Sequence, residues 1–459
     1  MRLKIENIVT IGANNFINAL SPGILILSLF LLSFSQNTQA QAGVQFSFGG
    51  PQDDMGRGAY QTSDKGYLIL GRTQSFGQGS DDILLTKTDS LGNILWSKTF
   101  GTALRDVGYN LKEDHSGGYI SVNWVVHSGS SYDDWYILRF DDNGNVVQEQ
   151  FIGGTDDDEI MNFDLTSDGG YIFAGSSRSV GLDGVDSWIV KTDASLNPLW
   201  NKTYTTGQSE HSRSIQETSS GNYAYLGNTG PGGVTIMNFF IMYLNSTGDT
   251  IWAKQAGGTQ YDYGRDAIIA NDGNFLYMGN TNSYGVGGYD ILLFKITPAG
   301  NVLWAKTYGG AGNDEAYQIS RSLDGNYMIA GTTTSFGVGD DLMLLNVNDN
   351  GDLIMANSVG GSQDDGIPYL AAALDSGYVI TTGSSSYGAG GQDVLVIKTD
   401  KYGNSCCTQP ITGLVVQNIS LDVSPISVDT SSGMILPSHT IISSNISSLR
   451  SAAWRKQHV

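Results

Sequence analysis

The stretch Asp290–Gly310, DILLFKITPAGNVLWAKTYGG, contains an apolar run, a Pro-Ala-Gly-Asn turn, a second run that carries Trp304, and a Gly-Gly exit. This order predicts a β-hairpin followed by a hinge. The same arrangement occurs at Asp82–Gly101 (DILLTKTDSLGNILWSKTFG) and, less regularly, five more times. The hairpin is therefore one part of a repeated unit.

An aromatic residue that follows Gly or Asn marks the same point of every repeat. These residues are spaced by 52 positions, with a last interval of 51: Tyr67, Tyr119, Tyr171, Tyr223, Phe275, Tyr327 and Tyr378. A fixed period of this length indicates a repeat architecture with seven units.

Each unit contains four segments typical of strands, separated by turns rich in Gly, Asp, Asn and Ser. In the first unit, one strand follows Asp54 and ends at the turn Thr62–Gly66, and the others are Tyr67–Thr73, Asp82–Thr88 and Ile94–Phe100. The middle strands are continuous apolar runs, which must be covered on both faces. The pattern predicts an all-β fold, a β-propeller with four-stranded antiparallel blades.

The seventh unit lacks its fourth strand, because Ser405-Cys406-Cys407 follows the turn at Gly403-Asn404. The missing strand lies at the other end of the repeats, where Val44–Gly50 aligns with Trp96–Thr102 of the first unit. We therefore predict a seven-bladed β-propeller over residues 43–407, closed by the N-terminal strand, which completes the last blade. Closure of the ring removes exposed strand edges.

The two ends of the chain lie outside the repeats. Residues 1–42 have the features of a signal peptide: Arg2 and Lys4, the apolar run Ile24–Phe34, and the small residues of Ala40-Gln41-Ala42. The apolar run is too short to span a bilayer, so we expect a secreted or cell-surface protein without a stable membrane span after signal removal. Residues 408–459 are rich in Ser, Ile and Val. We expect a C-terminal tail or linker there, with one strand within Leu414–Val423.

The charge balance limits the partners of the protein. Lys+Arg 24 against Asp+Glu 45 gives a net charge of −21, which repels phosphate backbones, so we expect no nucleic-acid partner. Extracellular glycans, proteins and cations stay open as partners of what we expect to be a monomer. The adjacent Cys406 and Cys407 could form a vicinal disulfide, pair with another chain, or have no role. They do not predict a zinc site.

The motifs Asp-Gly-Gly-Tyr, Asp-x-x-Gly-Asn and Trp-x-Lys-Thr-Tyr-Gly-Gly recur within residues 44–406. With them the chain resembles secreted bacterial β-propeller repeat proteins that are associated with type IX secretion. The resemblance implies a seven-bladed propeller of unsettled activity, and some members of the family carry endoglucanase-like descriptions. Members often end in a sorting domain, which residues 408–459 do not clearly match.

The most regular polar feature is an acidic residue 13 positions before each marker aromatic: Asp54, Asp106, Asp158, Glu210, Asp262, Asp314 and Asp365. A second series opens the third strand of each unit: Asp82, Asp134, Asp186, Asn238, Asp290, Asp341 and Asp393. In a propeller both series belong to one loop face. They could bind calcium or glycan hydroxyls, or accept backbone N–H bonds from the loops. Repetition in every unit favours the structural interpretation, so we predict no cofactor, with calcium as the alternative.

Side chains that differ between units are better candidates for a ligand site. Three positions after the first acidic series, near the mouth of the axial channel, stand Arg57, Tyr109, Met161, Arg213, Arg265, Tyr317 and Pro368. The arginines and tyrosines among them could hold an anionic or sugar ligand, although we favour pairing of the arginines with the acidic ring. For Trp96, Trp200, Trp252 and Trp304, which share another position, we favour packing between blades over sugar stacking.

Enzyme signatures are negative, since the five His residues lack metal-ligand spacing and no Gly-x-Ser-x-Gly elbow occurs. Our leading hypothesis is a secreted, non-catalytic binding or surface-interaction module. The alternative is a carbohydrate-active, endoglucanase-like hydrolase with its site on the acidic loop face. A hydrolase would show two facing carboxylates found in only one or two blades, with a raised pKa on at least one.

Overall fold

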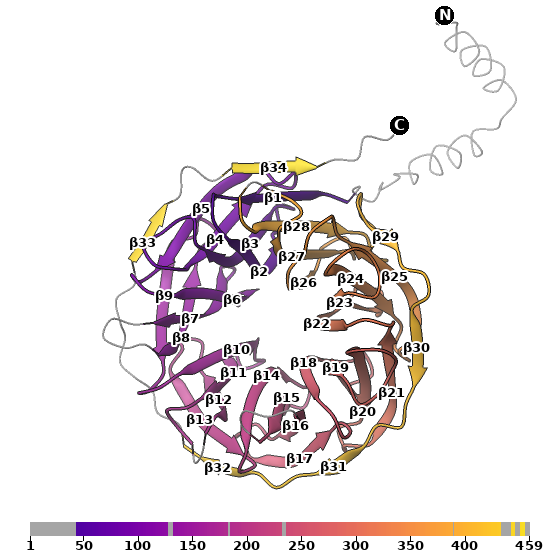
Figure 1. Cartoon of the computed structure of the whole chain (residues 1–459). Coiled ribbons are helices and arrows are strands. Elements are labelled where there is room, and N and C mark those ends of the chain that lie inside the picture. The colour runs from indigo at the N-terminus through magenta and orange to yellow at the C-terminus, as the bar shows by residue number, and fades with distance from the viewer. Residues whose placement is uncertain are drawn as a thin grey trace, which may run out of the picture. The chain divides into compact units, whose positions relative to one another are not determined.

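A computed structural model describes residues 43–126, 132–181, 184–231, 236–388, 390–432, 442–445 and 450–454. Within these ranges the regular secondary structure is entirely β-strand, in seven antiparallel sheets placed as blades around an axis (Figure 1). The predicted seven-bladed propeller is thus confirmed. The predicted signal peptide, residues 1–42, lies outside the described residues. In the described ranges, no helix has the length and apolar character that crossing a bilayer requires.

The blades follow the repeats in chain order, each listed from the axis outward. Blades one to three are β2 (Asp54–Gln61), β3 (Tyr67–Thr73), β4 (Asp82–Thr88) and β5 (Ile94–Gly101); β6 (Asp106–Glu113), β7 (Tyr119–Val126), β8 (Asp133–Phe140) and β9 (Val146–Ile152); β10 (Asp158–Leu165), β11 (Tyr171–Ser177), β12 (Asp186–Thr192) and β13 (Pro198–Thr205). Blades four and five are β14 (Ser209–Glu217), β15 (Tyr223–Gly230), β16 (Asn238–Leu244) and β17 (Thr250–Ala256); β18 (Asp262–Ile269), β19 (Phe275–Thr281), β20 (Asp290–Ile296) and β21 (Val302–Gly309). Blades six and seven are β22 (Asp314–Arg321), β23 (Tyr327–Thr333), β24 (Asp341–Val347) and β25 (Leu353–Val359); β26 (Tyr369–Ala372), β27 (Tyr378–Ser384), β28 (Asp393–Thr399) and β1 (Gln45–Gly49).

The N-terminal strand closes the ring as predicted. β1 pairs antiparallel with β28, with Phe46 opposite Val396 and Phe48 opposite Val394. Both phenylalanines are buried. The first strand of the described chain therefore serves as the fourth strand of blade seven.

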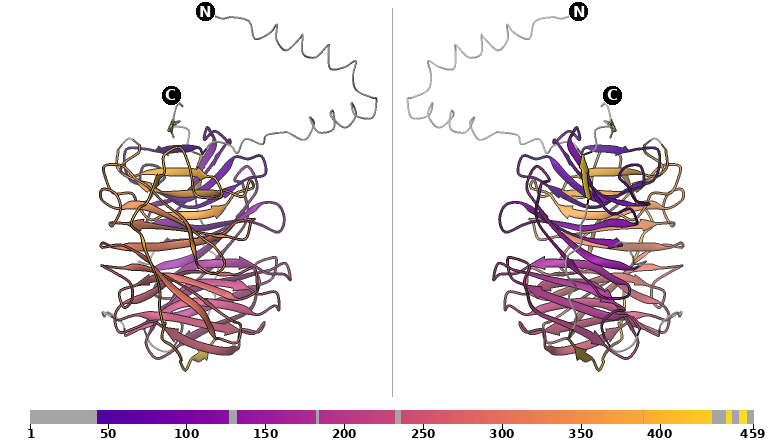
Figure 2. Two further views of the ribbon diagram at one scale, coloured as in Figure 1. Left: turned by 90° about the vertical axis from the view of Figure 1, so that its right-hand side faces the viewer. Right: turned by 90° about the vertical axis from the view of Figure 1, so that its left-hand side faces the viewer.

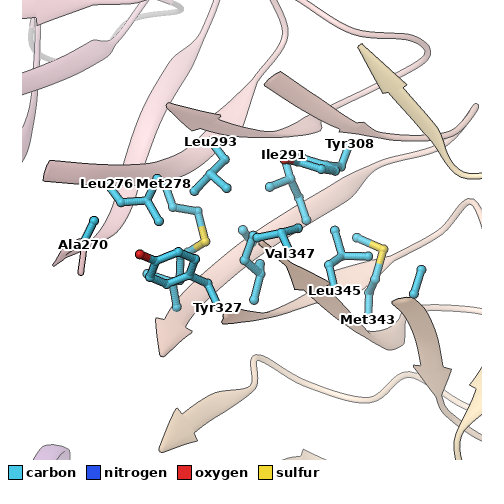
Figure 3. Close-up of a cluster of buried hydrophobic side chains, with 14 residues drawn as sticks. Ala270, Leu276, Met278, Ile291, Leu293, Tyr308, Tyr327, Met343, Leu345 and Val347 are labelled. Carbon is cyan, nitrogen blue, oxygen red and sulfur yellow. The ribbon is translucent and has the colours of Figure 1, made fainter. Parts of the chain in front are cut away.

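The hydrophobic core lies between blades rather than within a single central mass. One buried cluster fills each of the seven blade interfaces. Between blades five and six, Leu276, Met278 and Leu293 pack against Tyr327 and Met343 (Figure 3). This packing explains why the middle strands are apolar at successive positions, since β4, β12 and β20 are buried at every residue on both faces.

The C-terminal segment adds a fifth, outermost strand to six blades. Its strands are β29 (Gln409–Pro410), β30 (Val415–Asn418), β31 (Val423–Pro425), β32 (Asp429–Ser431), β33 (Ile442–Asn445) and β34 (Arg450–Trp454). They pair antiparallel with β25, β21, β17, β13, β5 and β1, in that order. The segment, which we name the belt, thus passes around the outside of the ring in the direction opposite to the blades (Figures 1 and 2). Blade two has four strands in the described residues.

The belt keeps its own spacing against the blades. Ile411, Ile419 and Ile426 donate their N–H groups to the carbonyls of Ala356, Ala305 and Ala253, at 2.9, 3.0 and 3.1 Å. These three alanines occupy equivalent positions in blades six, five and four. The sequence indicated a tail or linker with one strand in this region. In the structure, strand pairing begins at residue 409 and continues through six short strands.

Candidate functional site

The two ends of the propeller differ in the connections that they carry. The innermost strands β2, β6, β10, β14, β18, β22 and β26 line the axial channel (Figure 1). The loops between second and third strands, and the connections between blades, lie at one end, which we name the loop face. The tight turns lie at the other end, the turn face.

The acidic residues of both series lie at the loop face, where they hold the loops. Every member of the first series is at most 2% exposed. Asp262 accepts the Gly258 N–H at 2.6 Å and the Ser283 hydroxyl at 2.6 Å. In the second series, Asp82 accepts the N–H groups of Gln78 and Gly79 at 3.0 and 2.9 Å. These are the hydrogen bonds expected if the repeated carboxylates serve to hold the loops in shape.

Burial shifts the pKa values of these repeated carboxylates upward. It raises the pKa of Asp106 and of Asp290 to about 7, and the pKa of Asp158 to about 6. In each case the neighbouring acid of the other series adds to the shift. Among the described residues, no group of three or more His, Cys, Asp or Glu is placed to hold a metal ion.

The ligand-site candidates lie inside the channel rather than at its mouth. Each innermost strand of blades one to six contains a β-bulge, and the extra residue is the candidate itself. A bulge turns this residue out of the regular ladder. We name the six bulged residues the arginine layer: Arg57, Tyr109, Met161, Arg213, Arg265 and Tyr317. In blade seven the strand begins only after Pro368, and Tyr369 takes the corresponding place.

The arginine layer converges on the axis. Five of its residues, all except Arg57, line with Tyr369 a small cavity of about 40 Å³. The Arg57 guanidinium lies 5.7 Å from the centre of the Tyr109 ring, and the Tyr369 ring meets Tyr109 edge-on at 6.2 Å. Burial raises the pKa of Tyr109 to about 12, although Arg213, Arg57 and Arg265 all act to lower it. The structure therefore brings the five predicted candidates together from five blades.

The positive charge of Arg265 is balanced by a neighbouring carboxylate, that of Glu315. Its Nη2 atom lies 3.4 Å from the Glu315 carboxylate and 3.0 Å from the Tyr263 hydroxyl. The guanidinium sits between the rings of Tyr263 and Tyr317, 4.5 Å from each ring centre. This arginine pairs with an acid as expected, but the acid is Glu315 and not a member of the acidic series.

Arg57 and Arg213 form no direct ion pair of this kind in the described residues. Within the described residues, neither has a carboxylate oxygen within 4.0 Å, and the Nε atom of each is buried without a hydrogen-bond partner. Nη1 of Arg213 contacts the Met161 sulfur at 3.5 Å. Burial lowers the pKa of Arg213, and the nearby Arg265 lowers it further, whereas Tyr109 and the Glu159 carboxylate act to raise it. In the described residues, the pairing with the acidic ring that we favoured is absent for these two arginines.

A larger cavity of about 490 Å³ continues the channel toward the turn face. It shares Asn110, Asn162, Asp266 and Gln318 with the small cavity. Several of these side chains bond to the open inner edges of neighbouring strands. Gln318 accepts the Leu370 N–H at 2.5 Å, and Asp266 accepts the Ile319 N–H at 3.2 Å.

Asp266 is a functional candidate that the sequence did not single out. It is the one acid at its repeat position, where other blades carry Gly58, Asn110, Asn162, Ser214 and Gln318. Burial raises its pKa to about 6. Its second oxygen accepts the Ser214 hydroxyl at 3.0 Å and the Ala267 N–H at 2.8 Å. Both oxygens are therefore engaged in joining blades four, five and six.

The repeated tryptophans pack between blades, as expected. The indole N–H groups of Trp96, Trp200 and Trp252 donate to the carbonyls of Asp142, Ser246 and Pro298, at 3.2, 3.1 and 2.8 Å. Each acceptor lies in a turn of the next blade. The rings thus join adjacent blades at the turn face and do not form an open row for sugar stacking.

Comparison with known proteins gives fold neighbours at low identity. No family model and no curated protein matches the chain. Among solved structures, the chain is similar to the periplasmic gluconolactonase of Pseudomonas aeruginosa, with 13% identity, 86% of this chain and 100% of that chain covered, and a TM-score of 0.45. It is also similar to an endo-1,5-alpha-L-arabinanase from Thermotoga petrophila, with 11% identity, 77% and 99% coverage, and a TM-score of 0.29. These values do not bear on activity, and the resemblance to type IX-associated repeat proteins stays a prediction.

Proposed function

We propose that this protein is a non-catalytic binding module, secreted or held at the cell surface, whose arginine layer binds an anionic group of an extracellular ligand. The observation that carries the proposal is that, in the described residues, the guanidinium groups of Arg57 and Arg213 have no carboxylate oxygen within 4.0 Å and that the Nε atom of each is buried without a hydrogen-bond partner. A buried charge is unfavourable until it is paired. A guanidinium offers a planar fork of donors that fits a carboxylate or a similar oxyanion.

The carboxylates support binding rather than hydrolysis. Asp106, Asp158 and Asp290, whose pKa values are raised to about 6 or 7, belong to the repeated series. Asp266 stands in one blade only, but both of its oxygens already accept hydrogen bonds. Glu113, the other carboxylate that lines the larger cavity with Asp266, accepts the Tyr60 hydroxyl. In a glycoside hydrolase one of two facing carboxylates has a raised pKa, and both act directly on the substrate or on the attacking water.

A sugar acid is the ligand class that best joins the two cavities. The small cavity beside Arg213 has room for a single charged group, and the adjoining 490 Å³ is in the range of small-ligand sites. Extracellular glycans that contain uronic acids supply a carboxylate on a polar ring. The net charge of −21 opposes long-range attraction of anions, so we expect modest affinity that depends on the local arginines.

Isothermal titration calorimetry with galacturonate and glucuronate oligosaccharides tests the proposal. We expect binding to the full chain, and at least tenfold weaker binding to Arg213→Gln and Arg57→Gln. The matched control is Arg105→Gln, which removes an exposed arginine of the loop face that lies 3.3 Å from Asp133. Equal affinity of the full chain, Arg213→Gln and Arg57→Gln would overturn the proposal, as would the absence of binding by any acidic oligosaccharide.

A further inference from the structure

A cluster of tyrosines breaks the sevenfold repetition at the loop face of blade five. The ring centroids of Tyr261, Tyr263 and Tyr289 are 5.0, 5.9 and 6.2 Å apart, in edge-to-face contacts. At the position of Tyr261, other blades carry Asp53, Arg105, Asp157, Ser209, Asn313 and Asp364. At the position of Tyr289, they carry Asp81, Asp133, Val185, Met237, Asp340 and Gln392. Blade five alone has an aromatic ring at these two positions.

The tyrosine cluster has a buried base and a partly open top. Tyr263 is 9% exposed, whereas Tyr261 and Tyr289 keep more of their surface exposed. The backbone of both outer tyrosines is fixed, since the Tyr261 carbonyl accepts the Asn282 N–H at 2.9 Å and the Tyr289 carbonyl accepts the Asp314 N–H at 2.7 Å. The fixed backbone and the mutual contacts of the rings restrain the cluster before any ligand arrives, which lowers the entropic cost of binding.

Hydrogen-bond acceptors surround the cluster. Glu315 accepts the Tyr263 hydroxyl at 2.6 Å, and its charge raises the pKa of both Tyr289 and Asp340, next to the larger effect of burial. Asn282 Oδ1 is buried without a hydrogen-bond partner in the described residues. A ligand at this cluster thus meets ring surface together with the partly exposed Glu315 carboxylate, above the buried Asn282 oxygen.

We propose that the tyrosine cluster binds a neutral sugar ring. A pyranose has an apolar C–H face, which packs on aromatic rings, and a rim of hydroxyl donors, which suit carboxylate and amide acceptors. Glu315 is paired with Arg265, so the charge that disfavours an acidic sugar at the same place is that of Asp340, next to Glu315. The inference does not rest on anion binding in the arginine layer, although the two regions touch through Tyr263 and Arg265.

The repeats themselves suggest the substitutions that test the cluster. Tyr289→Asp and Tyr261→Asp introduce the residues that blade one carries at the same positions, Asp81 and Asp53. Tyr402→Ser is a matched control, because Tyr402 lies in a turn of the opposite face and is 40% exposed. Thermal unfolding of each variant checks that the propeller is intact.

Affinity is measured by calorimetry with cellohexaose, xylohexaose, mannohexaose and laminarihexaose on the full chain. We expect at least one of these neutral oligosaccharides to bind, with at least tenfold loss in Tyr289→Asp or Tyr261→Asp and no change in Tyr402→Ser. Arg213→Gln should leave neutral binding unchanged, which separates this site from the arginine layer. The inference is overturned if none of the four binds, if binding survives both tyrosine variants, or if Tyr402→Ser weakens it equally.

Discussion

Asp290 and Asp314 meet beside Gly309, where their nearest carboxylate oxygens lie 1.8 and 3.1 Å from the point that a β-carbon on the glycine would occupy. The same arrangement recurs at Gly101 between Asp82 and Asp106, with both oxygens 2.7 Å from that point. The two acidic series are therefore joined in pairs across blade interfaces. At these two positions the glycine leaves room for the carboxylates, whereas blade three carries Thr205 there, whose hydroxyl donates to Glu210.

A side chain at Gly309 should disrupt this pair. We expect Gly309→Ala to lower the free energy of unfolding by about 2–4 kcal/mol, because a buried carboxylate must move away from its partners. Gly273→Ala is the control: this glycine has a φ of 78° and no atom within 4 Å of the added carbon, so the expected loss is about 1 kcal/mol. Urea unfolding measures both, and equal losses would contradict the explanation.

Stability should fall as the pH rises toward 8. Asp290 has a pKa of about 7 in the folded protein, against an ordinary value of 3.8, so the folded state binds its proton more tightly than the unfolded state. Its contribution to stability is complete below about pH 4 and is lost as the pH passes 7. We expect the unfolding midpoint to be higher at pH 5 than at pH 8.

Asp290→Asn should reduce that pH dependence. Blade four already carries Asn238 at this position, so the amide fits the site. At pH 8 the variant should be about 1–2 kcal/mol more stable than the unmodified protein, and at pH 5 the difference should shrink. A variant that shows the same decline with pH as the unmodified protein would exclude this carboxylate as its source.

Loss of the Trp252 ring should destabilise the interface between blades four and five. The ring packs with the cluster of that interface and donates to the Pro298 carbonyl, but it is only partly buried. We therefore expect Trp252→Ala to lower the free energy of unfolding by about 2–3 kcal/mol, less than the 3–5 kcal/mol of a fully buried ring. Trp252→Met, the residue found in blade six as Met355, should lose less than about 1.5 kcal/mol.

The belt should contribute to stability through its apolar side chains. Ile419 packs on the cluster that contains Trp252, whereas Ser420 beside it is exposed. We expect Ile419→Asp to lower the free energy of unfolding by about 2–4 kcal/mol and Ser420→Asp to change it by less than about 0.5 kcal/mol. If calorimetric scans of the two variants coincide, the belt does not hold the blades together.

The blades were predictable because one period organises them, whereas the belt and parts of the site were not. The period that links the marker aromatics from Tyr67 to Tyr378 corresponds to one blade. Each blade buries both faces of its middle strands, so the apolar pattern of these strands is present in every repeat. The belt advances by only seven or eight residues per blade, from Ile411 to Ile426. The blades against which the belt packs determine its side chains, and the belt has no repeat of its own. A search of the sequence for a period of 52 residues therefore does not detect it.

Within the site, the series that contains Arg57 and Arg213 could be found in the sequence because its members follow the acidic residues at a constant spacing. The β-bulges that turn these residues into the channel have no sequence signal beyond a small residue before several of them, such as Gly56 and Gly264. Tyr369 was missed because the inner strand of blade seven starts late, after Pro368. Position in the repeat thus identifies equivalent residues, but the local backbone decides where their side chains lie.

The location of a bound anion tests the central proposal most directly. Crystals of the full chain and of Arg213→Gln can be soaked in sodium bromide, and an anomalous difference map then shows where the anion lies. We predict a bromide peak on the axis, in contact with the guanidinium groups of Arg57 and Arg213, that disappears in Arg213→Gln. Bromide found only on the outer surface, with an empty arginine layer in the unmodified protein, would contradict the proposal.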